Sequence, residues 1–155
     1  MRVMLDSNAV NPLALDPEVD ALMREAVSAG RLELVTASLV QRDEVDASKD
    51  DEVKRAALVR FIDEVTVPAD TPVFVLGVSR LDVDRLGAVD EADATYKEVQ
   101  IGSRRHSEDA VILVTAQREG IPVVTNETRR LRNQCLKRGI KVMTSDDLIA
   151  SVRLL

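Results

Sequence analysis

The sequence contains almost no aromatic side chains. Among its 155 residues there are no Trp, one Tyr and two Phe. A hydrophobic core must therefore be built from aliphatic residues, which make up most of the apolar 45% of the chain. Exposed bases would also find few rings on which to stack, which argues against a dedicated single-strand binding module. The apolar content predicts a packed globule, and the length predicts a single domain over residues 1–155.

Cysteine is also scarce, and the 21 basic residues are outnumbered by 27 acidic ones. Cys135 is the only cysteine, which excludes an intramolecular disulfide and fits a reducing compartment such as the cytoplasm. A net charge of −6 is the wrong sign for a protein whose main task is to hold a phosphate backbone. It is compatible with an acidic pocket for a divalent cation, because the cation reverses the local charge. No apolar run predicts a signal peptide or a membrane span, so no membrane partner is expected.

Short apolar runs alternate with amphipathic stretches along the chain. The runs predict strands at 3–5, 32–36, 122–125 and 141–143. Helical periodicity predicts helices from Pro17 to Gly30, over 51–65, 107–119 and 128–138, and from Asp146 onward. The middle is less regular: Pro68 and Pro72 bracket a polar link, and 79–95 reads as helix with loop. Such alternation predicts an α/β fold, a three-layer α/β/α sandwich around a mainly parallel sheet.

Four acidic residues stand where this fold would bring them together. Asp6 ends the first strand, and Glu127 closes the Thr125-Asn126-Glu127 run after a later one. Glu44 and Asp109 lie near the starts of helices that follow loops. Because the carboxyl ends of parallel strands share one edge, all four could converge there. Carboxylates are the ligands that Mg²⁺ and Mn²⁺ prefer, and such ions can activate water to attack a phosphodiester.

Together these motifs resemble those of the PIN-domain family, whose members include the VapC-type toxin ribonucleases. The resemblance rests on four segments in order: Leu5-Asp6-Ser7-Asn8, Glu44 in an early helix, His106 to Ile112, and Val123 to Glu127. It implies a PIN-like fold in which Asp6, Glu44 and Asp109 hold Mg²⁺ or Mn²⁺, completed by Glu127 directly or through water. The residues implied to orient these carboxylates are Ser7, Asn8, Thr125 and Asn126.

The resemblance implies a metal-dependent endoribonuclease that is the toxin of a toxin–antitoxin pair. An RNA substrate, an antitoxin protein and a homodimer would be its partners. The alternative is a non-catalytic PIN-like module that binds RNA or protein, favoured by the acidic net charge and by Glu127 where the family usually has Asp. A phosphotransfer receiver domain is disfavoured, because its acidic pair and lysine do not occur in the required order. Residues 72–102 match no part of the family pattern.

Each acidic residue also has a simpler interpretation. Asp6 could cap a helix that starts near Asn8. Glu44 could be an exposed charge on an acidic helix, and Glu108 competes with Asp109 as the charge that a helix N-terminus favours. Glu127 could equally be a charge that stabilises the start of the next helix. The order and spacing of all four motifs favour the metal site over these separate explanations.

Basic residues flank the two C-terminal acidic motifs. They could contact RNA phosphates or be solvated helix surface, and the sequence does not decide between these roles. His106 is the only histidine, and it is left outside the metal shell because a lone histidine is more often structural or exposed. The flanking basic residues are Arg104, Arg105, Arg129, Arg130 and Arg132.

Overall fold

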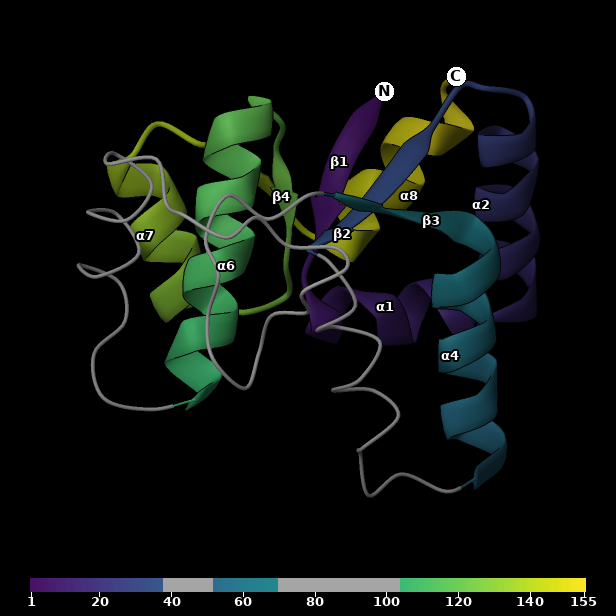
Figure 1. The fold of residues 1–155 in the computed structure, drawn as a ribbon. Helices are drawn as coiled ribbons and strands as arrows, with labels where there is room; N and C mark the ends of the chain where they lie inside the picture. The colour runs from purple at the N-terminus through teal and green to yellow at the C-terminus, as the bar shows by residue number, and fades with distance from the viewer. Residues whose placement is uncertain (38–51, 70–103) are drawn as a thin grey trace.

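A five-stranded parallel sheet forms the centre of the molecule. The computed structural model describes residues 1–37, 52–69 and 104–155, without the side chains of 104–108. The strand order is β3-β2-β1-β4-β5, and every neighbouring pair is parallel (Figure 1). The strands are β1 (Arg2–Leu5), β2 (Glu33–Ala37), β3 (Thr66–Ala69), β4 (Val123–Val124) and β5 (Val142–Met143).

Helices cover both faces of this sheet. In Figure 1, α6 (Arg104–Glu119) and α7 (Arg130–Lys137) lie on one side of the strands, opposite the other helices. The helices on the other face are α1 (Ser7–Ala14), α2 (Pro17–Ser28), α4 (Glu52–Val65) and α8 (Ser145–Arg153). The predicted three-layer α/β/α sandwich with a mainly parallel sheet is therefore confirmed.

The alternation of side chains along the strands divides the core in two. On β1, Val3 and Leu5 pack with α1, α2, α4 and α8, whereas Met4 packs with α6 and α7. On β4, Val124 joins the first cluster and Val123 the second. Successive strand residues point to opposite faces, so a sheet covered by helices on both sides needs apolar residues at every position. The continuous apolar runs of the sequence meet that requirement.

Turn and cap residues set the ends of the helices. Asp16 accepts hydrogen bonds from the backbone N–H groups of Glu18 and Val19, and Pro17 follows it in the first turn of α2. Gly120 and Gly139 follow α6 and α7 with φ of 65° and 70°, a conformation that costs a glycine little. Helix α8 begins with a capping box formed by Thr144 and Asp147. The helix ends in the structure agree with those predicted from the sequence to within a few residues.

Two elements differ from the sequence-based prediction. The segment Ser7–Ala14 is a helix. The sequence indicated a helix there only under the alternative in which Asp6 caps it. Thr66–Ala69 is a strand, where the prediction placed only a link that begins at Pro68. Pro68 is tolerated there because β3 pairs only with β2 among the described strands, so its missing N–H breaks no second ladder.

Some predictions concern single residues or fall outside the described part of the chain. Val53 is an apolar residue of the predicted helix over 51–65, but 81% of it is exposed, so it does not belong to the buried face of that helix. The predictions for residues 38–51 and 70–103, including Glu44, lie outside the described residues. None of the helices that the structure describes is long and apolar enough to cross a membrane.

Candidate metal and catalytic site

The strand register brings Asp6 beside Thr125. Leu5 of β1 pairs with Val124 of β4, so the next residue of each strand lies at the same edge of the sheet. The backbone N–H of Asp6 donates to the carbonyl of Val124 at 2.9 Å, which extends the pairing by one residue. Asp6 is only 7% exposed, an unusual burial for a carboxylate that requires polar partners. The centre of the sheet thus holds a buried acid at its carboxyl edge.

Two side chains hold one oxygen of Asp6. Its Oδ2 accepts a hydrogen bond from the Thr125 hydroxyl at 2.6 Å and one from the Asn8 amide at 2.5 Å. Asp6 occupies the N-cap position of α1, but its side chain makes no capping hydrogen bond to that helix. The simpler interpretation of Asp6 as a helix cap is therefore not realised. Its carboxylate is instead oriented by two residues that the resemblance had implied for that task.

Asn126 connects this pair to helix α8. Its backbone N–H donates to Asn8 Oδ1 at 2.8 Å. Its side chain forms a reciprocal pair with Ser145, in which Asn126 Nδ2 donates to the Ser145 hydroxyl and Asn126 Oδ1 accepts from the Ser145 backbone, both at 3.0 Å. Ser145 was not predicted from the sequence. Its position directly after a strand and a capping threonine is the signal that could have revealed it.

Glu127 turns toward the following helix. Its two carboxylate oxygens accept hydrogen bonds from the backbone N–H groups of Arg130 and Leu131, each at 2.6 Å. These donors belong to the first turn of α7, which has no intrahelical acceptor for them. The alternative interpretation of Glu127, as a group that favours the start of the next helix, describes this geometry. Its backbone N–H donates to the Thr125 hydroxyl at 3.0 Å, so Glu127 also adjoins the Asp6 cluster.

Asp109 comes to the same edge from α6. That helix leads into β4 and runs opposite to the strands, so its N-terminal turns lie at their carboxyl ends (Figure 1). Asp109 is half-buried in its second turn, followed by the buried residues Ala110 to Ala116. These buried residues pack the helix against the sheet. The placement of Asp109 agrees with its predicted position near the sheet edge.

The Cys135 thiol responds to the charges of three of these acids. Burial is the first cause of a rise in its pKa from 9.0 to about 12, and the charge of Asp6 is the second. Asp109 and Glu127 raise the pKa further, whereas Arg138 lowers it. A charge acts on a thiol in this way only over short distances in a protein interior. Asp6, Asp109 and Glu127 are therefore each near enough to Cys135 for their charges to act on its thiol.

The donor chemistry of this region suits a hard divalent cation. Carboxylate, amide and hydroxyl oxygens gather there. Within residues 1–37, 52–69 and 104–155, however, no three Asp, Glu, His or Cys side chains already form a group that could hold a metal ion. Glu44, the remaining predicted ligand, lies outside those residues. A complete centre would need Glu44 or a rearrangement of Asp109 or Glu127.

The predicted RNA contacts are only partly described. Arg129 is exposed just before α7, and Arg130 is half-buried in its first turn. The side chains of Arg104, Arg105 and His106 lie outside the described ones, although all three belong to α6. Asn8 and Asn126 are exposed, so the carboxyl edge of the sheet is open to solvent beside the buried Asp6. A charged substrate could approach it from that side.

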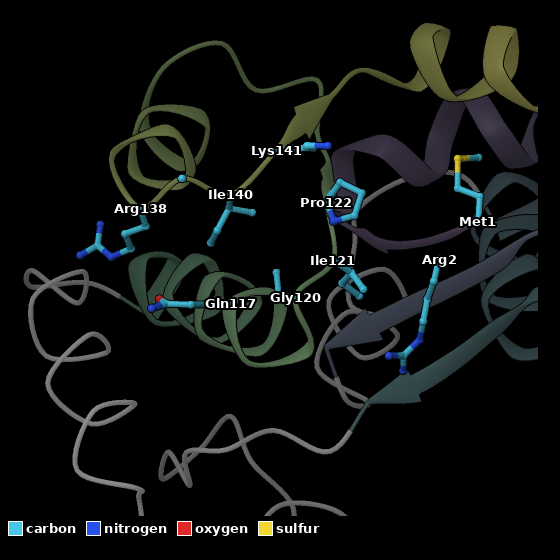
Figure 2. Close-up of a pocket in the computed structure, with 11 residues that line it drawn as sticks. Met1, Arg2, Gln117, Gly120, Ile121, Pro122, Arg138, Ile140 and Lys141 are labelled. Carbon is cyan, nitrogen blue, oxygen red and sulfur yellow. The ribbon is translucent and has the colours of Figure 1, made fainter.

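The two described pockets lie away from this site. One, with a volume of about 460 Å³, lies at the opposite edge of the sheet (Figure 2). Its lining includes Arg2, Pro122 and Lys141 at the strands' N-terminal ends, and Arg138 after α7. A wider hollow lies between the α1–α2 turn and α8. The chemistry at the carboxyl edge, rather than the shape of these pockets, identifies the candidate site.

Comparison with known proteins relates the chain to solved structures. No family model matches the sequence, and no curated protein matches it. Among solved structures, PAE2754 from Pyrobaculum aerophilum superimposes with a TM-score of 0.58 at 15% identity, covering 100% of both chains. A structure of VapBC2 from Rickettsia felis, bound to a DNA fragment from their promoter, gives a TM-score of 0.52 at 16% identity and covers 93% of this chain and 98% of that one. At such identity the likeness shows the fold.

Proposed function

We propose that this chain is a metal-dependent endoribonuclease with a PIN-like fold and acts as the toxin of a toxin–antitoxin pair. One observation carries the proposal. A carboxylate that is almost wholly buried ends the central strand, and Asn8 and Thr125 fix one of its oxygens. An acid that served only to solubilise the surface or to cap α1 would not need this arrangement. Ligands of open α/β sheets bind at this edge.

The proposed metal is Mg²⁺ or Mn²⁺. Asp6, Asp109 and Glu44 would hold it, and Glu127 would take part directly or through water. When bound, such an ion lowers the pKa of a coordinated water and stabilises charge on a phosphodiester oxygen. The protein's own contribution is orientation: Thr125 and Asn8 fix the Asp6 carboxylate, and the exposed Arg129 would contact the RNA backbone.

The toxin role rests on the order of the acidic motifs, with support from the fold. VapBC2 of Rickettsia felis, whose fold is similar, was solved bound to a DNA fragment from its promoter. We propose that this chain also has an antitoxin partner and forms a homodimer. Without the antitoxin it would cleave RNA.

A non-catalytic PIN-like module is the second candidate. The specific observation in its favour is that both carboxylate oxygens of Glu127 already bind the backbone of α7. An acid committed to a helix end has less freedom to complete a metal centre. Such a module would bind RNA or protein without metal uptake.

A metal-dependent cleavage assay with Asp109→Asn separates these two functions. The purified chain and the variant are incubated with a panel of structured and single-stranded RNAs, with Mn²⁺, with Mg²⁺ or with chelator. We expect cleavage by the wild type to require the metal and to fall more than about 100-fold in the variant, because one metal-binding carboxylate becomes a neutral amide. Asp63→Asn, an exposed acid on α4, is the matched control and should cleave normally. Equal cleavage by wild type and Asp109→Asn would exclude the nuclease.

A further inference from the structure

Four polar residues form a continuous hydrogen-bonded path from helix α8 to Asp6, in which the backbone N–H of Asn126 makes the link to Asn8. The path runs from Ser145 through Asn126 and Asn8 to Asp6. It joins three segments that are far apart in sequence: the start of α8, the residues after β4 and the start of α1. Ser145 is buried, with 1% of its surface exposed, although serine is usually a surface residue. This buried hydroxyl is therefore connected to Asp6 through Asn126 and Asn8.

Backbone donors fix the direction of every bond in this path. A backbone N–H can only donate, so the N–H of Ser145 obliges Asn126 to present Oδ1 to it. The Nδ2 of Asn126 then faces the Ser145 hydroxyl, which must accept from it. The hydroxyl proton of Ser145 remains for the carbonyl of Ala9, at 3.2 Å in α1. The orientation of the Asn126 amide is thereby set by the two groups of Ser145, and it agrees with the bond that Asn126 Nδ2 donates to the Asn8 carbonyl at 3.4 Å.

The same reasoning applies one step nearer to the acid. The backbone N–H of Asn126 can only donate, so Asn8 must present Oδ1 to it. The Nδ2 of Asn8 is then the group that meets Asp6 Oδ2. The carboxylate can only accept, so Asp6 and the backbone of Asn126 require the same orientation of the Asn8 amide. If the backbone of Asn126 moved away, Asn8 would lose one of the contacts that hold its amide against Asp6.

We infer that Ser145 is a positioning residue that holds the Asp6 carboxylate in its oriented state through Asn126 and Asn8. The inference deepens the proposed function, on which the metal-binding part of its test rests. Ser145 would not touch a metal or a substrate. Its effect would be to keep a donor on Oδ2 of Asp6, so that the carboxylate has one orientation before a cation binds.

The first measurement uses the metal-free full chain and does not depend on the proposed function. In Ser145→Ala we expect the side-chain ¹H–¹⁵N signal of Asn8 to shift or broaden, and the backbone N–H of Asn126 to exchange with solvent about tenfold faster. Ser151→Ala is the matched control, because Ser151 lies on the same helix and its hydroxyl also donates to a backbone carbonyl, that of Asp147, at 2.7 Å. It should leave both signals unchanged.

The comparison between the two variants decides the inference. If Asn8 and Asn126 keep their wild-type signals in Ser145→Ala, Ser145 does not position this path. An equal change in Ser151→Ala would show that any loosening of α8 has the same effect, and it would also overturn the inference. Asn126→Ala keeps the backbone N–H that donates to Asn8 but removes the side chain that ties this backbone to Ser145 and to the Asn8 carbonyl. Because residue 126 is exposed, this variant should disturb Asn8 even if Ser145→Ala does not fold. An unchanged Asn8 signal in that variant contradicts the inference too.

The second measurement is Mn²⁺ binding by titration calorimetry. Groups that contact metal ligands directly typically change metal affinity by about 10- to 100-fold. Because Ser145 acts through two intermediates, we expect Ser145→Ala to weaken binding by less, about three- to tenfold. The double variant Ser145→Ala/Asn126→Ala should bind no more weakly than Asn126→Ala, since both interrupt one path. Mn²⁺ binding unchanged in Ser145→Ala would overturn the inference. A wild type that binds no Mn²⁺ but shows the NMR response would contradict the proposed function and leave the positioning role standing.

Discussion

The two edges of the sheet hold their charged groups in different ways. At the carboxyl edge, Asp6 is buried and its partners come from α1 and from the residues after β4. At the amino edge, Arg2 lies between Glu33 and Glu119, at 2.8 Å from each, with 39% of its side chain exposed. Exposed ion pairs contribute little to stability because water screens them. The comparison teaches that burial and neutral hydrogen-bond donors, rather than the number of charges, distinguish the candidate site.

The largest effect should follow from Thr125→Val, which removes the hydroxyl between the two strands but keeps the shape of the side chain. Asp6 would lose a donor while its carboxylate stayed buried, and we expect the free energy of unfolding to fall by about 1–3 kcal/mol. The affinity for Mn²⁺ should fall by about 10- to 100-fold. Chemical denaturation and calorimetry measure the two effects. Thr66→Val, whose hydroxyl donates to the Ile62 carbonyl at the end of α4, is the control for affinity.

Glu127→Gln should have the next largest effect on stability. The amide keeps one acceptor for the first turn of α7 but loses the second acceptor and the negative charge. We expect a loss of about 0.5–2 kcal/mol in the free energy of unfolding. Glu119→Gln provides the same chemical change at the opposite edge and should cost less.

Mn²⁺ affinity in Glu127→Gln then defines the role of this acid. If Glu127 only caps α7, the affinity should stay at the wild-type value while the stability falls. A large fall in affinity would instead make Glu127 a metal ligand that leaves the helix when the cation binds. No change in stability would contradict the capping geometry.

The pH dependence of Cys135 offers a smaller but direct test of the charges beneath the carboxyl edge. Folding raises the pKa of this thiol from 9.0 to about 12, first through burial and then through Asp6. The thiol of the unfolded chain therefore loses its proton first, and stability should decline as the pH rises above 9. Cys135→Ala should reduce this slope in denaturation curves. In the folded wild type at pH 8, the thiol should not react with Ellman's reagent; rapid reaction would contradict the burial.

The smallest effect should come from Arg2→Met at the amino edge. The variant loses both ion pairs but keeps much of the apolar stem, so we expect a change of less than about 1 kcal/mol in unfolding free energy, smaller still at high salt. RNA cleavage should be unchanged. If Arg2→Met lowered the free energy of unfolding as much as Thr125→Val, the two edges would not differ in the way described.

The sheet and most helices could be predicted from the sequence because each of them carries a local signal. Strands buried on both faces give continuous apolar runs, and Pro17, Gly120 and Gly139 mark helix ends by their backbone preferences. The sequence of α1 argues against a helix, since Pro12 lies inside it. In the same way, Pro68 argues against a strand at the position of β3. Both are stabilised by their neighbours in the fold, which a local pattern does not record.

The site was predictable only in part, for a similar reason. The motifs indicated Asp6, and the resemblance implied Ser7, Asn8, Thr125 and Asn126 as orienting residues. Of these, Asn8, Thr125 and Asn126 belong to the hydrogen-bonded cluster around Asp6. The resemblance alone could not show that Glu127 would bind the backbone of α7, because a carboxylate near a helix start suits either role. Ser145 belonged to none of the four motifs, and only its place directly after a strand and a capping threonine marked it. Its importance follows from a contact with Asn126 across 19 residues, which depends on the packing of α8 beside α1.

The bonds around Asp6 also set the order in which the candidate site can form during synthesis. The hydroxyl of Thr125 is separated from Asp6 by 119 positions, and Ser145 from Ala9 by 136. A ribosome makes Asp6 and Asn8 almost together, but Thr125 only 119 positions after Asp6. A chain whose translation has not reached Thr125 therefore contains the carboxylate with only one of the two side chains that hold its Oδ2. The arrangement of the candidate site is completed only after β4 and the start of α8 have been made.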